Sequence, residues 1–236
     1  MQFQSPLTPG HLERRYQRFL ADVTLQDGRR VTAHCPNTGS MLGCDRPGSR
    51  VWLSRSDNPR RKYAWTWELV EASPGTLVGI HTGRSNALVR EALECGRVPE
   101  LGELISLRPE VRYGREGSRV DFVAECAGGR WYLEVKNVTA AVESGIALFP
   151  DAVSVRASRH LRELMAVVAE GHRAAVLFCA QRADVRQVQP ADQIDPAYGA
   201  ALRVAMACGV TAIGLGASVA TEGIELTRRL PVVCPR

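Results

Sequence analysis

Long apolar runs, paired cysteines and lysine are all scarce in this 236-residue sequence. No stretch approaches the roughly 18 to 20 uninterrupted apolar residues that a membrane-spanning helix needs, and the opening residues lack the charged-then-apolar plan of a signal peptide. We therefore expect a cytoplasmic protein with no membrane partner. At this length the chain can bury one large core or two smaller ones.

The seven cysteines stand singly, with no CxxC pair among them. An odd number of cysteines cannot fully pair as disulfides, and a structural zinc site needs ligands in close-set pairs. We therefore expect reduced, mostly buried thiols, and neither a disulfide framework nor a zinc site.

Lysine is nearly absent, since 28 of the 30 basic residues are Arg and the two exceptions are Lys62 and Lys136. An ammonium is a compact point charge that fits beside a reacting phosphate where a planar guanidinium does not. Lys136 is therefore a candidate for a specific chemical role.

The basic excess is confined to one part of the chain. Residues 1–85 hold 12 Lys and Arg against 7 Asp and Glu, while residues 86–236 hold 18 against 18. Such an excess suits the backbone of a nucleic acid, although a basic surface kept for solubility would give the same count.

Turn signals divide residues 13–85 into short strands, which indicates a small β-barrel. An OB-like barrel fits the number of strands and could bind oligonucleotides, but an SH3-like barrel would give a similar pattern. Tyr63, Trp65, Trp67 and Leu69 share one face of a predicted strand and are either barrel core or a base-stacking platform. The expected strands cover 15–25, 29–35, 50–56, 60–72 and 76–82.

Helical spacing begins at Ser85 or Asn86, one of which is expected to cap a helix. We therefore predict two domains, residues 1–85 and 86–236. The second has the order of a mixed α/β sheet flanked by helices, so the predicted fold is a two-domain α+β or α/β protein. Its expected elements are helix 85–96, strands 103–114, 118–127 and 130–138, a linker, helix 154–171, strand 173–181, helix 196–209, and strands 210–218 and 223–230.

Two carboxylates and a lysine converge on one predicted hairpin. If Gly128-Gly129 forms the turn, Asp121 lies directly opposite Lys136 and Glu134 is a diagonal neighbour of Asp121. The three side chains then share one face of the sheet.

This set has a simple chemical use. Asp121 and Glu134 can hold Mg²⁺ or Mn²⁺, which polarises a phosphate and activates a bound water, while Lys136 orients that water or offsets developing charge. Glu110 on the preceding strand could add a ligand or simply be solvated. A surface ion pair across a hairpin would involve the same residue types without any function.

Further candidates point to nucleic acid binding. In helix 154–171, Arg156 and His160 lie one turn apart with Arg159 adjacent, as a phosphate-binding set would, although single helical histidines are usually structural. The loop after residue 35 is rich in small hydrogen-bonding groups, which also fits a plain barrel turn. The candidate nucleic-acid-binding residues are Asn37, Thr38, Ser40, Lys62, Arg156, Arg159 and His160.

The pair formed by Asp121 and the triplet Glu134-Val135-Lys136 resembles the PD-(D/E)xK nuclease superfamily, in which these residues sit on adjacent strands and bind divalent metal. Val120 stands where the motif has Pro. More broadly, the chain resembles the sugar fermentation stimulation protein A family of bacteria and archaea. The similar segments are HCPNTGSM (34–41), SNALVREAL (85–93), SRVDF (118–122), LEVKNVT (133–139) and FPDAVSVRASRHLREL (149–164).

That resemblance implies a DNA-binding protein with an N-terminal OB-like domain and a nuclease-like C-terminal domain, associated with genes of sugar, notably maltose, metabolism. Arg159 stands where the family's helix motif has Lys. A phosphate contact survives this change, whereas a role that needs a titratable lysine does not.

Three functions remain open. The first is a Mg²⁺- or Mn²⁺-dependent nuclease with Asp121, Glu134 and Lys136 as its catalytic residues and DNA as the expected partner, RNA being the alternative. The second is a non-catalytic DNA-binding transcriptional regulator. The third, a carbohydrate enzyme with paired carboxylates, has no use for Lys136.

Overall fold

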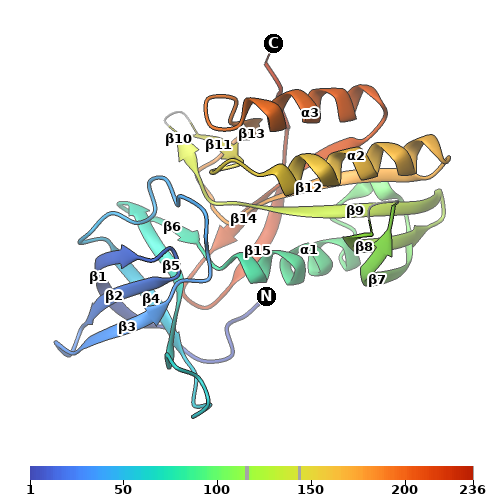
Figure 1. Ribbon diagram of the computed structural model, residues 1–236. Coiled ribbons are helices and arrows are strands. Elements are labelled where there is room, and N and C mark those ends of the chain that lie inside the picture. Colours follow the sequence, from blue (N-terminus) through green and yellow to red (C-terminus); the bar gives the residue numbers. More distant parts are fainter. Residues whose placement is uncertain (115–116, 143–144, 236) are drawn as a thin grey trace.

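A closed β-barrel and a larger sheet covered by helices lie side by side in the computed structural model (Figure 1). The structure describes residues 1–114, 117–142 and 145–235. The predicted order, a barrel followed by a mixed sheet, is confirmed. Within these three ranges no helix is both long enough and apolar enough to cross a membrane.

The barrel strands have the order β3-β2-β1-β4-β5-β6. The barrel closes because β3 also pairs with β5. Its centre is filled by alternate apolar residues of these strands, among them Leu12, Val23, Leu53 and Trp67. The strands are β1 (Thr8–Tyr16), β2 (Leu20–Leu25), β3 (Arg30–His34), β4 (Arg50–Arg55), β5 (Trp65–Ser73) and β6 (Thr76–Gly79).

Two details of the barrel differ from the prediction. The single strand expected over 15–25 is two strands, because Gln17 and Arg18 adopt positive φ angles of 49° and 65° and form a turn. The aromatic row is interrupted at Glu68, where β5 bulges against β4, so that Trp67 faces the barrel core while Leu69 packs in the core of the other sheet.

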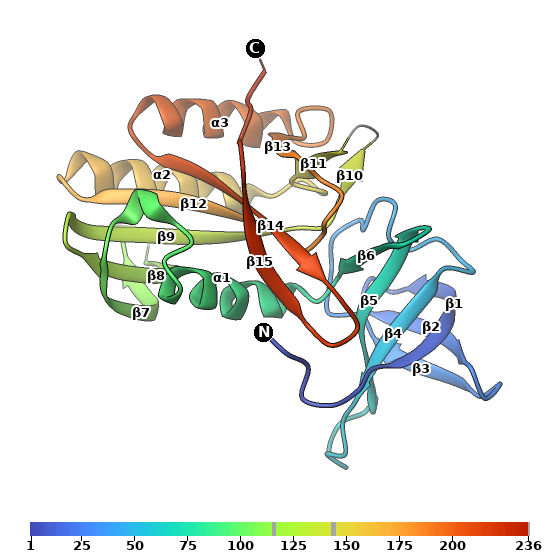
Figure 2. The same ribbon diagram turned by 180° about the vertical axis from the view of Figure 1, so that it is seen from behind.

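The larger sheet has the order β15-β14-β12-β9-β8-β7, with β12 parallel to both β9 and β14. Figures 1 and 2 show α1 on one side of this sheet and α2 and α3 on the other. Two separate apolar cores result, one beside α1 and one beneath α2 and α3. The elements are α1 (Ser85–Glu94), β7 (Leu104–Tyr113), β8 (Ser118–Cys126), β9 (Gly129–Val138), α2 (Val155–Ala169), β12 (Arg173–Ala180), α3 (Pro196–Ala207), β14 (Thr211–Val219) and β15 (Ile224–Leu230).

The segment expected to be a linker instead contains strands. β10 (Ala141–Val142) and β11 (Ile146–Phe149) form a small sheet with β13 (Gln187–Pro190). After β11 the chain enters α2 through Ser154, whose hydroxyl accepts a hydrogen bond from the amide of Ala157. Asp195 accepts hydrogen bonds from the amides of Ser154 and Tyr198, so one carboxylate fixes the starts of both α2 and α3.

A barrel loop, residues 36–44, docks beside the start of α2. The amide of Asn37 donates to Thr139 Oγ1 (3.1 Å), and Asp151 Oδ2 accepts from the backbone N–H of Met41 (3.1 Å). At the other end of the chain, the backbone N–H of Phe3 donates to the carbonyl of Glu222 (2.9 Å). Because the chain's first residues also bond to the larger sheet, the division into two domains at residue 85 stays a prediction.

Substituting Gly39 tests the docking of this loop. A Cβ at Gly39 would lie 2.2 Å from Asp151 Oδ2, the same oxygen that holds Met41. We expect Gly39→Ala to lower the free energy of unfolding by about 1–3 kcal/mol, because the carboxylate must move and the hydrogen bond is lost. Urea denaturation measures this, with Ser40→Ala in the same loop as the control. Equal stability of the two variants would contradict the docking.

Candidate metal and nucleic-acid site

The predicted hairpin register was wrong by two residues. The turn is Ala127-Gly128, and the pairing of β8 with β9 runs from Cys126–Gly129 to Phe122–Leu133. Asp121 is therefore level with Glu134 rather than with Lys136. A shift of two residues leaves every side chain on its original face of the sheet, so the predicted grouping of the three residues is kept.

Where the pairing of β8 with β9 ends, the side chain of Asp121 accepts a backbone hydrogen bond from β9. Its Oδ2 accepts a hydrogen bond from the backbone N–H of Val135 (2.7 Å), and its Oδ1 accepts one from the side-chain amide of Asn86 (2.9 Å). Asn86 lies in the first turn of α1. Strand and helix together therefore hold the carboxylate of Asp121 in one orientation.

Glu134 is only 3% exposed, and the two oxygens of its carboxylate have different surroundings. Oε1 accepts a hydrogen bond from Lys136 Nζ (2.7 Å) and also contacts His160 Nδ1. Oε2 is buried and has no hydrogen-bond partner among the described residues. One oxygen is thus fully engaged and the other is available to a ligand.

His160 connects Glu134 to the first turns of α2. Its Nε2 accepts a hydrogen bond from Arg156 Nε (3.3 Å), which assigns the ring proton to Nδ1, the atom that contacts Glu134. His160 is itself 3% exposed. It therefore acts on Glu134 from inside the protein rather than from the surface.

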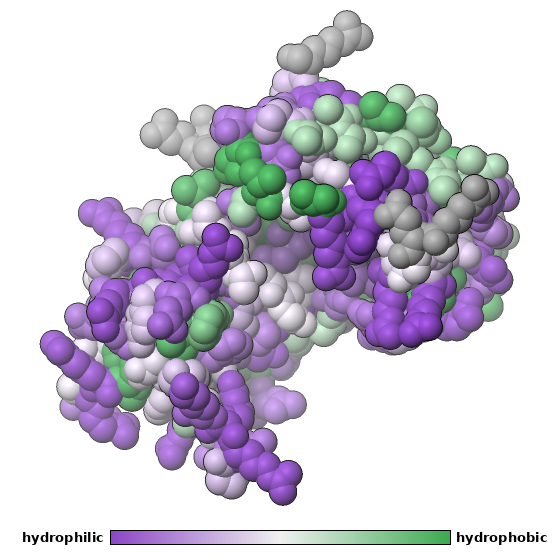
Figure 3. All heavy atoms as spheres, viewed as in Figure 1, coloured by the Kyte–Doolittle hydropathy of each residue, from purple (hydrophilic) through white to green (hydrophobic). Residues whose placement is uncertain are grey.

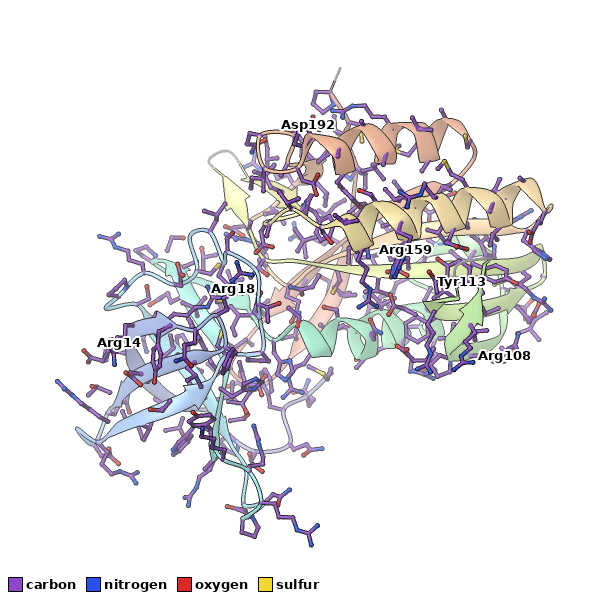
Figure 4. All side chains as sticks on the ribbon, in the orientation of Figure 1. Arg14, Arg18, Arg108, Tyr113, Arg159 and Asp192 are labelled. Atoms are coloured by element: carbon purple, nitrogen blue, oxygen red, sulfur yellow. The ribbon has the colours of Figure 1, made fainter. Side chains whose placement is uncertain are left out.

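A cavity of about 360 Å³ opens over these residues. Its wall combines carboxylates on the strands with guanidinium groups, chiefly from α2, and Figure 4 shows Arg159 pointing from α2 toward the strands. Arg159 Nε is buried without a hydrogen-bond partner in the described part of the chain. The lining residues are Glu110, Gly117, Ser118, Arg119, Asp121, Glu134, Arg156, Arg159 and His160.

The electrostatics of the two carboxylates differ. Burial raises the pKa of Asp121, and the charge of Glu134 raises it further. Burial also acts to raise the pKa of Glu134, but the hydrogen bond from His160 and the charge of Lys136 outweigh it, so that pKa is lowered. Glu134 is held ionised, whereas the charge on Asp121 is costly unless a cation lies nearby.

These residues fit a hard divalent cation. The free Oε2 of Glu134 and the carboxylate of Asp121 supply oxygen donors in a cavity that also holds cations for a phosphate. Over the described ranges, no three His, Cys, Asp or Glu side chains are close enough to hold a metal by themselves. Two carboxylates suit Mg²⁺, which usually completes its coordination with waters and substrate phosphates.

The other predicted site residues are placed as follows. Glu110 is exposed on β7 and forms part of the cavity wall. Asn37 is buried, with its amide bonded within the protein, so it is not available for a nucleic-acid contact. Thr38 and Ser40 are exposed on the docked loop. Lys62 lies between β4 and β5 with its ammonium over the ring of Tyr63, outside the cavity wall.

Sequence reasoning missed two residues of the site. Asn86 was considered only as a helix cap, but Arg84 occupies the N-cap position and Asn86 instead holds Asp121. Arg119 lines the cavity two residues before Asp121 on the same strand. That spacing places both side chains on one face and is the signal that could have identified Arg119.

Two family models match the chain. The model described as "SfsA N-terminal OB domain" covers residues 14–80, which distinguishes the OB from the SH3-like alternative, and the model described as "Sugar fermentation stimulation protein RE domain" covers residues 83–223.

Full-length relatives agree with these models. The chain is 60% identical over 238 residues to the sugar fermentation stimulation protein homolog of Alkalilimnicola ehrlichii, covering 100% of both chains. It is 59% identical to the homolog of Thioalkalivibrio sulfidiphilus, covering 98% of both. A solved structure titled "The structure of Pyrococcus Furiosus SfsA in complex with Ca2+" matches with a TM-score of 0.88 at 28% identity, covering 99% of this chain and 98% of that one.

The contact between His160 and Glu134 gives a test of the site geometry. We expect His160→Ala to lower the free energy of unfolding by about 3–5 kcal/mol, because it removes a partner from a buried charge. His160→Asn should retain much of that stability, since the Asn amide can donate from the position of Nδ1. Chemical denaturation measures both, with His172→Ala as the control. Equal destabilisation by Ala and Asn would contradict the assigned hydrogen bond.

Proposed function

The chain belongs to the sugar fermentation stimulation protein family, and from this premise we propose that it is a magnesium-dependent phosphodiesterase acting on nucleic acid. The observation that carries the proposal is the buried, unpartnered Oε2 of Glu134 beside Asp121 in a cavity that also holds arginines. Carboxylate oxygens for a metal and guanidinium groups for a phosphate form a complementary pair of sites.

Each residue has a distinct part in this function. Asp121 and Glu134 would hold the metal, which when bound would supply Lewis-acid chemistry for the attack of water on the phosphate. Arg156 and Arg159 bind non-bridging oxygens of the phosphate from the α2 side of the cavity, a role that suits a guanidinium group. Glu110 lines the same cavity and would be a further oxygen ligand for the metal.

Lys136 is placed for charge compensation. Its ammonium lies 2.7 Å from Glu134 Oε1, the oxygen that His160 also contacts. From there it offsets the negative charge of Glu134 and of the pentavalent phosphate as that charge develops. A role in orienting the attacking water requires the ammonium to leave Glu134 once substrate is bound.

The solved relative from Pyrococcus furiosus, whose title states a complex with Ca²⁺, supports a divalent-metal site in this chain. Ca²⁺ and Mg²⁺ both prefer oxygen ligands, but Mg²⁺ demands fewer protein ligands and keeps more waters. We propose Mg²⁺, with Mn²⁺ as a substitute, because two carboxylates are available. DNA is the proposed substrate and RNA the alternative.

Isosteric variants test this function. We expect Glu134→Gln and Asp121→Asn to lower the rate of cleavage at least about 100-fold and to weaken Mn²⁺ binding, because each removes an anionic ligand. Cleavage is measured on labelled single-stranded and duplex DNA and RNA with Mg²⁺, Mn²⁺ or chelator, and Mn²⁺ binding by calorimetry. Glu125→Gln is the matched control, because Glu125 lies on β8 with Asp121 but is ion-paired with Arg130.

Two results would overturn the proposal. If the wild type cleaves none of the substrates in either metal yet binds DNA equally well with chelator, the protein is a DNA-binding regulator. If it cleaves but Glu125→Gln is as impaired as Glu134→Gln, the catalytic site lies elsewhere.

A further inference from the structure

Most of the large hydrophobic side chains that are exposed in the described ranges lie in three segments. These are the turn 17–19, the loop 36–44 and residues 151–156 at the start of α2. Four of the seven large hydrophobic residues that are exposed in the described ranges are Phe19, Leu42, Val153 and Val155. Val155 alone is 81% exposed although it begins α2. Figure 3 shows hydrophobic surface over the start of α2, beside hydrophilic surface and above the region where the barrel meets the larger sheet.

Hydrogen bonds hold the first two segments together. The guanidinium of Arg15 donates to the carbonyl of Arg18 in the turn (2.9 Å) and to the carbonyls of Asn37 (2.9 Å) and Gly39 (2.7 Å) in the loop. The Arg15 side chain is only 9% exposed. The turn that presents Phe19 is therefore fixed against loop 36–44.

The third segment adjoins the loop on its other side. Asp151 Oδ2 accepts from the backbone of Met41, and Gly39 lies so close to this carboxylate that no side chain fits between them. Asp151 leads through Val153 to Val155, and the next residue, Arg156, lines the metal cavity. The three segments thus form a continuous series from the barrel turn to the proposed active site.

The turn itself carries conformational strain. Gln17 and Arg18 have consecutive positive φ angles of 49° and 65°, a conformation normally taken by glycine or asparagine. Such backbone strain is concentrated at functional sites. Its effect here is to place a cation and an aromatic ring next to each other, both exposed to solvent.

We propose that these three segments bind a single-stranded polynucleotide and lead it to the metal cavity. The inference rests on the proposed function and specifies its substrate class. Duplex DNA presents mainly phosphates and groove edges, whereas an unpaired strand also presents base faces that bind aromatic and apolar side chains. Phe19 and the two valines contact bases, while Arg18 and Arg156 contact phosphates.

The charge of the segments favours a polyanion over a protein partner. Their ionisable side chains are Arg18, Asp151 and Arg156, apart from thiols, and Asp151 is already hydrogen-bonded to the loop. With Asp151 counted as negative, the net charge of the segments is still positive. It continues into the cavity through Arg159 and Arg119.

The experiment measures binding of the full chain to fluorescein-labelled probes in chelator, so that cleavage plays no part. The probes are an oligothymidylate of about twenty nucleotides, an oligouridylate of equal length and a DNA duplex. We expect Phe19→Ala to weaken binding of the single strands about 5- to 100-fold, the range for losing a base-stacking contact. Val155→Ser, which removes an apolar contact, should weaken their binding by a smaller factor. Val204→Ser, which changes an exposed valine on α3, is the matched control and should change nothing.

The proposal is overturned if Phe19→Ala and Val155→Ser bind single strands as tightly as the wild type does. It is also overturned if Val204→Ser loses as much affinity, or if the Phe19 and Val155 variants lose as much affinity for the duplex. A wild type that binds none of the probes would also overturn it. The two oligonucleotides distinguish DNA from RNA. If single strands bind as expected but no metal supports cleavage, the proposed nuclease fails and the binding path stands.

Discussion

Glu134 carries a charge into a part of the protein that water scarcely reaches, and the surrounding elements offset the cost of burying it. An unpaired buried carboxylate costs several kcal/mol, so it needs partners of opposite charge or strong hydrogen bonds. Lys136 and His160 both supply them to a single oxygen, Oε1. The arrangement leaves Oε2 without a hydrogen-bond partner among the described residues, in a side chain that lines the cavity.

The same constraint explains how distant parts of the chain meet. His160 must come from α2, so the start of α2 is fixed by Ser154 and, through Asp195, by α3. Asp121 must be oriented, so α1 contributes Asn86. The barrel loop then docks on Asp151, just ahead of α2, which holds the barrel against the segment that leads into this helix.

The sequence predicted the order of elements well because periodicity and turn residues report local structure directly. The hairpin register was wrong by two residues, yet Asp121 and Glu134 still met, since the period of a strand is two. The turn at Gln17 and Arg18 was missed because it contains none of the residues that normally mark such turns. β10 and β11 were missed because both are short and because β11 pairs with β13, far along the chain.

Long-range hydrogen bonds account for the rest. No local pattern indicates that Asn86 reaches Asp121 or that His160 reaches Glu134, because 35 and 26 residues separate the partners. The motifs drew attention to these residues but gave them other roles, a helix cap and a nucleic-acid contact. Tertiary structure assigned both to holding the carboxylates.

The most direct measurement is crystallographic. A crystal of the protein soaked in Mn²⁺ and measured at the manganese absorption edge locates the ion by its anomalous signal, independently of any activity. The account predicts one strong peak within coordination distance of Glu134 Oε2 and the Asp121 carboxylate. No peak there, with a water or a side chain hydrogen-bonded to Oε2 instead, would contradict it.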